Sequence, residues 1–174
     1  MTTIMPPEDL SMRVKCLPFQ LRAYYVSEFS IKTNGEFNSQ KESEFRFSSL
    51  KFGMDFKELD SEKESQDSEH LKGYDLWEVK LNVSIDEEKA KKNNIPYSFF
   101  IALLGLFSFP QKNPTPKDVQ LRFVRINGPS ILYGFVREIV NSFYDKGPYP
   151  SPVLPTISFY FPEKKEDKGE KKDS

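Results

Sequence analysis

Residues 77–109 read WEVKLNVSIDEEKAKKNNIPYSFFIALLGLFSF, two apolar runs joined by a charged segment. In residues 77–85 apolar and polar side chains alternate strictly, which predicts a strand with one face buried and the other in water. In residues 97–109 apolar side chains occupy both alternating sets of positions. The polar residues 87–94 predict a hairpin connection between these two strands. An apolar second face must be covered by a helix, by another subunit or by a ligand.

Two earlier segments also predict strands. Residues 19–31 place apolar side chains on one face at a spacing of two, namely Phe19, Leu21, Ala23, Tyr25, Phe29 and Ile31. Residues 45–56 start the same alternation and then shift its parity, as a β-bulge or a crossover would, with apolar positions at Phe45, Phe47, Leu50, Phe52, Met54 and Phe56. Residues 57–72 are charged and serine-rich, which predicts an exposed connection.

A long amphipathic helix is expected downstream. Residues 118–125 predict a short helical turn, and Asn127-Gly128-Pro129 then opens the helix with Pro129 in its first turn. Apolar residues recur at helical spacing up to the stop signal at 146–148, namely Ile131, Leu132, Phe135, Val136, Ile139, Val140 and Phe143. Four prolines then force an extended path through residues 148–159.

These elements predict an α+β fold, a four-stranded antiparallel sheet with a long amphipathic helix packed against it. We expect three parts: an N-terminal extension at 1–12, one domain at 13–162 and a disordered charged tail at 163–174. At 174 residues the chain is long enough to bury a core without disulfides or metals.

The composition excludes several classes of function. There are 25 Lys and Arg against 26 Asp and Glu, so the net charge of -1 disfavours nucleic acid as a partner. The single cysteine, Cys16, fits a reducing compartment, so we expect a cytoplasmic protein. The N-terminus does not resemble a secretory signal. The longest apolar run, 99–107, is shorter than the about 20 residues that a membrane span needs, so no membrane insertion is expected.

Residues with catalytic or metal-binding chemistry are scarce. His70 is the only histidine and lies in the charged connection, so no histidine-containing triad or metal cluster can be assembled. Glycine-rich phosphate loops are absent, and the acidic residues 86–88 are followed by lysines, as in a solvated hairpin. We therefore expect no enzyme activity, no metal and no cofactor. The unusual feature is aromatic content, 14% of residues with 16 Phe, which indicates either a ring-rich core or an apolar binding surface.

One stretch is more specific. The run Asn127-Gly128-Pro129-Ser130-Ile131-Leu132-Tyr133, then Arg137-Glu138 and Gly147-Pro148-Tyr149-Pro150, resembles the helical signature of the SecB family of bacterial export chaperones. Leu154-Pro155-Thr156-Ile157-Ser158-Phe159 is similar to that family's extended segment after the helix. Weaker similarity in the strands extends the resemblance over most of residues 19–161.

The resemblance implies a holdase that keeps unfolded or precursor polypeptides soluble for export, without nucleotide, as a homotetramer built as a dimer of dimers. It implies a client groove rich in aromatic side chains, for which the candidates are Phe45, Phe47, Phe52, Phe56, Tyr97, Phe99 and Phe100. Each of these residues could equally belong to the core or to a subunit interface. The family's second, C-terminal helix is expected to be missing, because Pro162 and a charged run follow Phe161.

The family passes export clients to the SecA motor, whose basic tail binds an acidic face of the sheet. By resemblance Glu28 is one of these docking carboxylates, whereas Lys32 and Phe100 stand where other acids are expected, so docking should be weak. The other interpretation is that Glu28 and Lys32 pair with each other on a solvated strand. Two alternatives to a general export factor are a dedicated chaperone for one client, such as an antitoxin, and a structural scaffold subunit.

Overall fold

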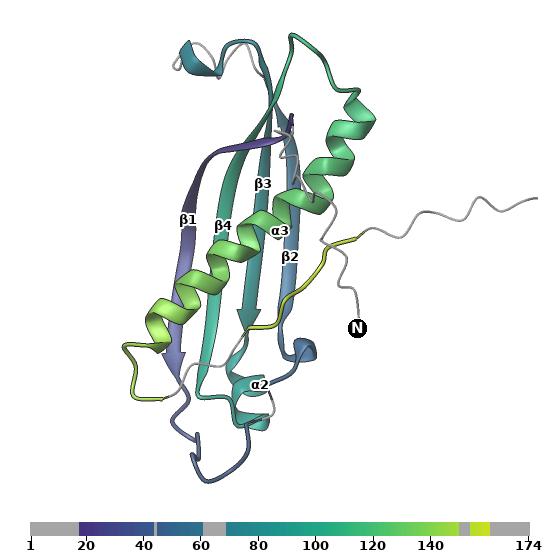
Figure 1. The fold of residues 1–174 in the computed structure, drawn as a ribbon. Coiled ribbons are helices and arrows are strands. Elements are labelled where there is room, and N and C mark those ends of the chain that lie inside the picture. The colour runs from purple at the N-terminus through teal and green to yellow at the C-terminus, as the bar shows by residue number, and fades with distance from the viewer. Residues whose placement is uncertain (1–17, 44, 61–68, 150–153, 161–174) are drawn as a thin grey trace, which may run out of the picture.

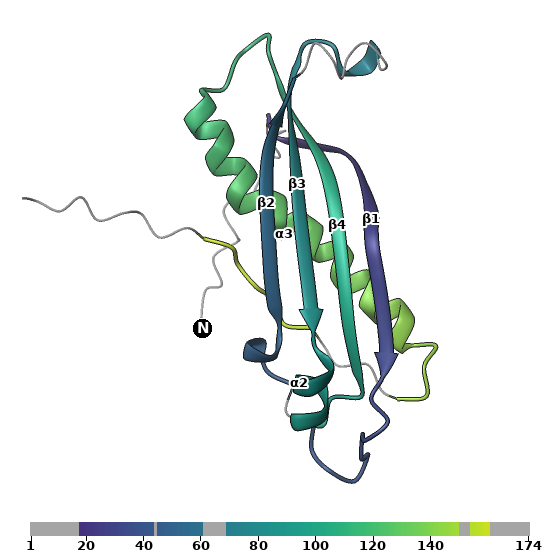
Figure 2. The same cartoon turned by 180° about the vertical axis from the view of Figure 1, so that it is seen from behind.

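The computed structural model describes residues 18–43, 45–60, 69–149 and 154–160. One antiparallel sheet has the strand order β1-β4-β3-β2, formed by β1 Gln20–Thr33, β2 Lys51–Leu59, β3 Tyr74–Ile85 and β4 Tyr97–Pro110. Helix α3, Lys117–Tyr144, crosses one face of this sheet diagonally (Figure 1), and no helix of the described residues covers the other face (Figure 2). We call these the helix face and the open face. The predicted α+β architecture is confirmed.

The two central strands follow the pattern that their sequences predict. The odd-numbered residues of β3, from Trp77 to Ile85, are all buried against the helix face. The odd-numbered residues of β4 share that face, while its even-numbered set, Phe100, Ala102, Leu104 and Leu106, lies on the open face. Strand β4 is therefore apolar on both sides, as the sequence indicates.

The face assignment predicted for the first strand is wrong in part. Irregularities at Leu21/Ala23 and Val26/Glu28 interrupt the pairing of β1 with β4. Successive side chains of a strand point to opposite sides of the sheet. Each extra residue therefore moves the side chains that follow it to the opposite face. Ala23 and Tyr25 consequently pair with residues of the open-face set, whereas Tyr24 joins the helix-face set. Two shifts cannot be recognised from alternation alone.

The second strand begins later than predicted. A 3-10 turn, η1, spans Phe47–Ser49, so Phe47 is its first residue and Phe45 lies before it. Strand β2 itself starts at Lys51. The parity change in the sequence thus marks the passage from a turn into a strand. Strand β2 then continues to Leu59, two residues beyond the start of the connection predicted at 57–72.

The helix start predicted at Asn127-Gly128-Pro129 is also wrong, because α3 is continuous from Lys117 and contains Pro129 in its interior. Proline removes one hydrogen bond from a helix, which local reasoning interprets as a boundary. Here packing outweighs that cost: Gly128 and Pro129 are both buried. A Cβ atom added at Gly128 would lie 3.0 Å from Cγ2 of Val79, so glycine permits the close approach of α3 to β3.

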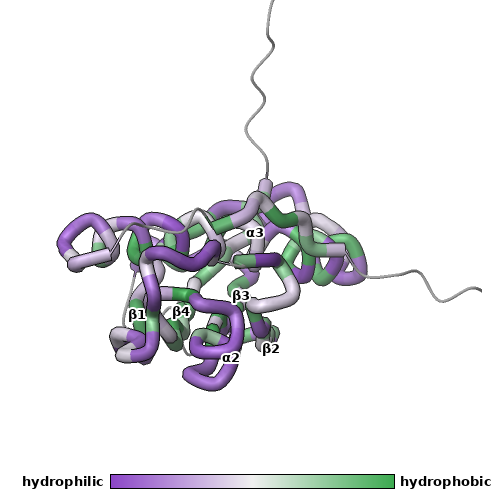
Figure 3. The backbone as a smooth tube through the Cα atoms, turned by 90° about the horizontal axis from the view of Figure 1, so that it is seen from below, coloured by the Kyte–Doolittle hydropathy of each residue, from purple (hydrophilic) through white to green (hydrophobic). Residues whose placement is uncertain are grey.

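Short elements complete the described chain. Helix α2, Glu87–Lys92, lies in the β3–β4 connection, which was predicted only as a polar hairpin, and a 3-10 turn η2, Glu69–Leu71, carries the exposed His70. Seen along the strands, α2 is hydrophilic at one end of the sheet (Figure 3). The N-terminal extension at 1–12, Cys16 and the charged tail at 163–174 lie outside the described residues.

Candidate functional site: an aromatic groove beside strand β2

The residues that follow α3 form a hollow on the helix face. Residues 154–160 run as an extended segment past α3 and across β2 (Figure 1). A cavity of about 170 Å³ lies between this segment, η1 and β2, and we call it the aromatic groove. Its lining consists of Phe47, Phe52, Met54, Ile157, Ser158, Phe159 and Tyr160.

Ring contacts organise the groove. Phe52 stacks on Phe47 with 5.7 Å between ring centroids, and it meets Phe159 edge-on at 5.9 Å. Tyr133 of α3 contacts both, at 6.0 Å from Phe52 and 6.3 Å from Phe159. Phenylalanine side chains have no hydrogen-bonding group, so these contacts impose little directional constraint and can adapt to different apolar partners.

The groove retains exposed apolar side chains. Phe47 is 57% exposed, Met54 40% and Tyr160 78%. Contiguous exposed apolar surface on a folded domain marks a site of interaction. Methionine suits such a surface because its unbranched side chain fits partners of varied shape.

The extended segment 154–160, which lies opposite β2, is anchored to α3. The Tyr133 hydroxyl donates a hydrogen bond of 2.9 Å to the backbone carbonyl of Pro155. Burial raises the pKa of Tyr133, which keeps this hydroxyl protonated as a donor. Leu154 and Phe159 are buried in the same core. One wall of the groove is thus held by α3.

The other wall depends on α2. The Lys89 ammonium donates to the carbonyl of Ser48 at 2.7 Å, and the Asn93 amide donates to Oγ of Ser49 at 3.2 Å. Both acceptors belong to η1, the turn that carries Phe47. The β3–β4 connection therefore positions an exposed ring of the groove.

The crossover between β1 and β2 is tied to the same connection by two asparagines. The Asn34 amide donates to the carbonyl of Ile95 at 2.9 Å, and Asn94 donates to the carbonyls of Asn38 and Lys41, each at 2.9 Å. Asn94 adopts a φ of 49°, in the left-handed region that asparagine tolerates. The crossover is fixed to this connection by these polar contacts.

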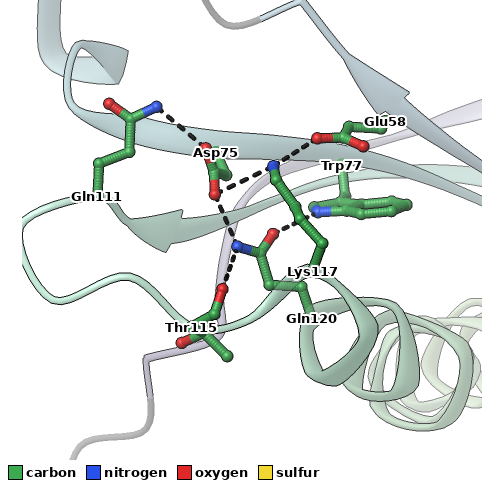
Figure 4. A network of polar contacts seen from close by, with 7 residues as sticks. All are labelled: Glu58, Asp75, Trp77, Gln111, Thr115, Lys117 and Gln120. Carbon is green, nitrogen blue, oxygen red and sulfur yellow. Dashed lines mark hydrogen bonds and ion pairs between the residues drawn. The ribbon is translucent and has the colours of Figure 1, made fainter.

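A network of polar side chains fixes the opposite end of α3, and we call it the Asp75 network (Figure 4). Gln120 is buried; its amide oxygen accepts from the Trp77 indole at 2.9 Å and its amide nitrogen donates to Asp75 at 2.6 Å. The same nitrogen donates to the carbonyl of Thr115 at 2.8 Å. Every hydrogen-bonding atom of the Gln120 side chain is therefore used.

Lys117, at the start of α3, completes the Asp75 network by bridging Asp75, at 3.1 Å, and Glu58 of β2. Burial would raise the pKa of Asp75, but hydrogen bonds from Gln111, Gln120 and Lys117 outweigh it and hold the pKa below its usual value. The network joins α3 to two strands and contains no unpaired charge that would mark it as a reactive site.

The structure places the predicted client-contact residues in different environments. Phe45, Phe52 and Phe56 are half-buried on the helix face, and Phe47 is exposed beside Phe52. Tyr97 and Phe99 are 5% and 3% exposed and belong to the core. Phe100 lies on the open face. Only Phe47 and Phe52 of this set line the aromatic groove.

The expected docking residue Glu28 lies on the open face, as do Lys32 and Phe100, which stand where other acids were expected. Glu28 pairs in register with Ala102, and Lys32 with Ser98, two residues from Phe100. The alternative interpretation, that Lys32 pairs with Glu28, is wrong, because the Lys32 ammonium contacts Glu87 of α2 at 2.6 Å. This hydrogen bond and charge raise the pKa of Lys32 and lower that of Glu87. The lysine thus remains charged near the place where an acid was expected.

Sequence reasoning missed the groove residues Met54, Ile157, Phe159 and Tyr160 as a set. The apolar side chains among prolines at 154–160 were a usable signal, but their partners on β2 are about a hundred residues away in the chain. It also missed the Asp75 network, whose members come from four separate segments.

The geometry first defines a class, an α+β protein in which one sheet and one long helix carry an exposed aromatic groove. Comparison with known families then gives a match to "Preprotein translocase subunit SecB" over residues 15–164. The chain therefore belongs to the SecB family, and this membership supports a chaperone role.

Similar solved structures include the SecB-like chaperone Rv1957 of Mycobacterium tuberculosis, in complex with a ChAD peptide from the Rv1956 HigA1 antitoxin. It is 12% identical, with 82% of this chain and 93% of that chain covered and a TM-score of 0.48. A protein of unknown function from Streptococcus agalactiae is 10% identical, with 79% and 96% covered and a TM-score of 0.47. No curated protein matches the sequence.

The described residues lack two kinds of feature. None of the helices there is long and apolar enough to span a membrane. Within the same described ranges, no three His, Cys, Asp or Glu side chains are grouped so that they could hold a metal ion.

Proposed function

We propose that this protein is a holdase, which binds unfolded apolar segments of other polypeptides in the aromatic groove and keeps them soluble without nucleotide. The observation that supports the proposal most is the line of exposed Phe47, Met54 and Tyr160 beside the rings of Phe52 and Phe159. Apolar burial contributes about 25 cal/mol per Å² and requires no particular client sequence.

The experiment is aggregation of a chemically unfolded client, followed by light scattering, with and without the protein and with no ATP. The unaltered chain should suppress aggregation, and Phe47→Ser combined with Phe52→Ser should weaken the suppression. Tyr25→Ser is the matched control, because Tyr25 is equally exposed but pairs on the open face. Equal suppression by all three proteins would refute the groove assignment.

We further propose that the protein assembles as a tetramer, a dimer of dimers. Strand β1 is an edge of the sheet, and a long edge strand invites pairing with another chain. Beside it Tyr24 stacks on Phe135 of α3 at 3.9 Å, and Val26 and Ile131 are exposed. Light scattering should give the mass of a tetramer, and Ile131→Glu should lower it. A monomeric mass for the unaltered chain would contradict this assembly.

A dedicated chaperone for one client is the second candidate, and the open face favours it over a general export factor. Lys32, although paired with Glu87, places a cation on the same face as Glu28, where a basic SecA tail would bind, and Phe100 carries no charge. Calorimetry with the SecA tail should show weak or undetectable docking. Tight docking that Glu28→Ala abolishes would instead support an export factor.

A further inference from the structure

The aromatic groove contains one side chain with a sulfur atom, that of Met54. The sequence has 4 methionines, and Met54 is the only one within the residues that the structure describes. It lies in the middle of β2, an edge strand of the sheet, and its side chain is 40% exposed. A small oxidant in water can therefore reach the thioether without any movement of the fold.

Oxidation would change the character of this side chain. The sulfur of an accessible methionine attacks hydrogen peroxide, the O–O bond breaks, an S–O bond forms, and the second oxygen leaves as water. The sulfur is oxidised by two electrons and the peroxide is reduced by the same two. The product, a sulfoxide, is polar, whereas the thioether is a flexible apolar group that adapts to varied partners.

The neighbours of Met54 on the helix face are apolar. Phe52 and Phe56 lie two residues away on either side along β2, and side chains at this spacing share one face of a strand. Leu81, which pairs with Met54 in register, is buried. None of these side chains can donate a hydrogen bond. Among them, a sulfoxide oxygen would depend on water for its hydrogen bonds.

This dependence on water would oppose the binding of a client. The hydroxyl groups of the lining belong to Ser158 and Tyr160, which are exposed residues of the opposite wall. An apolar client segment that covers the oxidised Met54 removes water and supplies no donor in its place. Burial of a polar group without a hydrogen-bond partner costs enough free energy to weaken binding about tenfold.

The fold itself should tolerate the oxidation. Met54 is not a member of the hydrophobic core, nor of the half-buried apolar residues packed against it, which include Phe52 and Phe56. The sulfoxide oxygen can project into solvent in the free protein, because the side chain is partly exposed already. Oxidation therefore acts on the surface that a client covers and not on the interior.

We propose that Met54 is a modification site that makes the aromatic groove sensitive to oxidants: its conversion to the sulfoxide by hydrogen peroxide weakens client binding, and reduction restores it. Methionine sulfoxide reductases carry out the reverse step with a dithiol, which becomes a disulfide while the oxygen leaves as water. This inference rests on the proposed holdase function and adds a means of regulating it.

The test follows binding of a fluorescently labelled apolar peptide, free of methionine and cysteine, to the full chain by anisotropy. The chain is treated with hydrogen peroxide, which catalase then removes. Trypsin cleaves after Lys51 and Lys57, so the mass of residues 52–57 reports the oxidation of Met54 alone. The oxidised chain should bind the peptide about tenfold more weakly. Treatment with the two reductases, one for each sulfoxide epimer, should restore the original affinity.

Substitutions separate Met54 from the other oxidisable residues. Met54→Leu, which keeps an apolar side chain of similar volume, should bind the peptide normally and lose the sensitivity to peroxide. Met54→Gln should bind weakly without any peroxide. Met12→Leu and Cys16→Ser are the matched controls and should remain as sensitive as the unaltered chain. Bound peptide should also slow the oxidation of Met54, because it covers the sulfur.

Four results would overturn the proposal. Complete oxidation of Met54 with unchanged affinity would show that the sulfoxide does not disturb the groove, and a peroxide effect that persists in Met54→Leu would place the sensitive group elsewhere. Failure of peroxide to oxidise Met54 at concentrations that oxidise N-acetylmethionine would show that the sulfur is covered. A fall in the midpoint of thermal unfolding by more than about 2 °C would assign the effect to the fold.

Failure of the holdase function is distinguishable from these results. The unoxidised chain would then not bind the peptide at all, although the mass of residues 52–57 would still report the sulfoxide. Binding by the unoxidised chain that oxidation leaves unchanged would instead retain the holdase function and reject only the role of Met54.

Discussion

The two ends of helix α3 are held in different ways. At the N-terminal end Gln120, Lys117 and Asp75 use polar contacts of defined length to tie the helix to two strands. At the C-terminal end, and in the segment that follows, aromatic rings supply most of the contacts, and the Tyr144 hydroxyl has no partner. The N-terminal end thus adds directional bonds to the ring contacts of Phe123 with Phe19 and Phe109, whereas at the C-terminal end Phe143 and Tyr144 make ring contacts, which have no required direction.

This difference shows where binding is possible without loss of the fold. A polar network in which every group has a hydrogen-bond partner has no free donor or acceptor for a binding partner. Disturbing such a network lowers the stability of the fold. Ring contacts can be exchanged for those of a client at little cost, since both are apolar. The aromatic groove is built from such ring contacts, between η1, β2, the middle of α3 and the segment 154–160. Substitutions in the Asp75 network should therefore alter stability, and those in the aromatic groove should alter binding.

The largest effect on stability is expected from Gln120→Ala. It leaves the buried Trp77 indole and part of Asp75 without partners, which should lower the free energy of unfolding by about 3 kcal/mol. Urea unfolding followed by fluorescence of Trp77, the single tryptophan, measures this directly. Gln111→Ala, which removes an exposed bond to the same carboxylate, should cost less than about 1 kcal/mol. Equal costs would show that burial is not what matters in the network.

A pH-dependent effect should follow from Asp75. Its pKa is lower in the folded protein than the ordinary value of 3.8, so the folded state releases this proton more readily than the unfolded state. The resulting stabilisation is complete above that ordinary pKa and is lost as the pH falls through the lower folded value. Asp75→Asn should lose stability mainly near neutral pH and less in acid.

Unfolding curves of both proteins across the acidic range test this expectation. The pKa of Asp86 is also lowered, chiefly by Lys51, so both proteins should share that part of the slope. The difference in unfolding free energy between the two proteins therefore reports the contribution of Asp75 alone. A difference that is constant with pH would mean that the carboxylate contributes through its shape and not through its charge.

A smaller effect is expected from Tyr144→Phe, which removes only the unpartnered hydroxyl. The free energy of unfolding should rise or stay within about 0.5 kcal/mol of the original value, because no hydrogen bond is lost. Tyr133→Phe removes a hydroxyl that does donate, to Pro155, and should cost about 1 kcal/mol. Thermal unfolding of the two variants side by side gives the comparison. A larger loss for Tyr144→Phe would show that its hydroxyl has a partner.

The sequence was informative where one periodicity governed a whole segment. Strand β3 and both faces of β4 could be predicted, because the burial of alternate side chains repeats over the full strand. The prediction failed where the alternation of apolar and polar side chains shifts by one residue. Two irregularities in β1 exchanged Tyr24 and Tyr25 between faces, and the turn η1 took the place of a predicted strand start.

The candidate site was predictable only in part for a related reason. Phe47 and Phe52 are near neighbours in the chain and could be proposed together, whereas Phe159 joins them only through tertiary packing. Pro129 appeared to begin a helix because local rules cannot weigh the burial of Gly128 against Val79. Contacts between residues that are far apart in the chain cannot be recognised from a short window of sequence.

The most direct test of the central claim, that clients bind along the aromatic groove, is site-specific photo-cross-linking. A photo-reactive phenylalanine analogue is placed at Phe47 or at Tyr25, which are 57% and 56% exposed and lie on different surfaces. The groove position should cross-link an unfolded client strongly and the open-face position weakly, with stability unchanged within about 0.5 kcal/mol for both. Equal yields from the two positions, or a higher yield from Tyr25, would contradict the account.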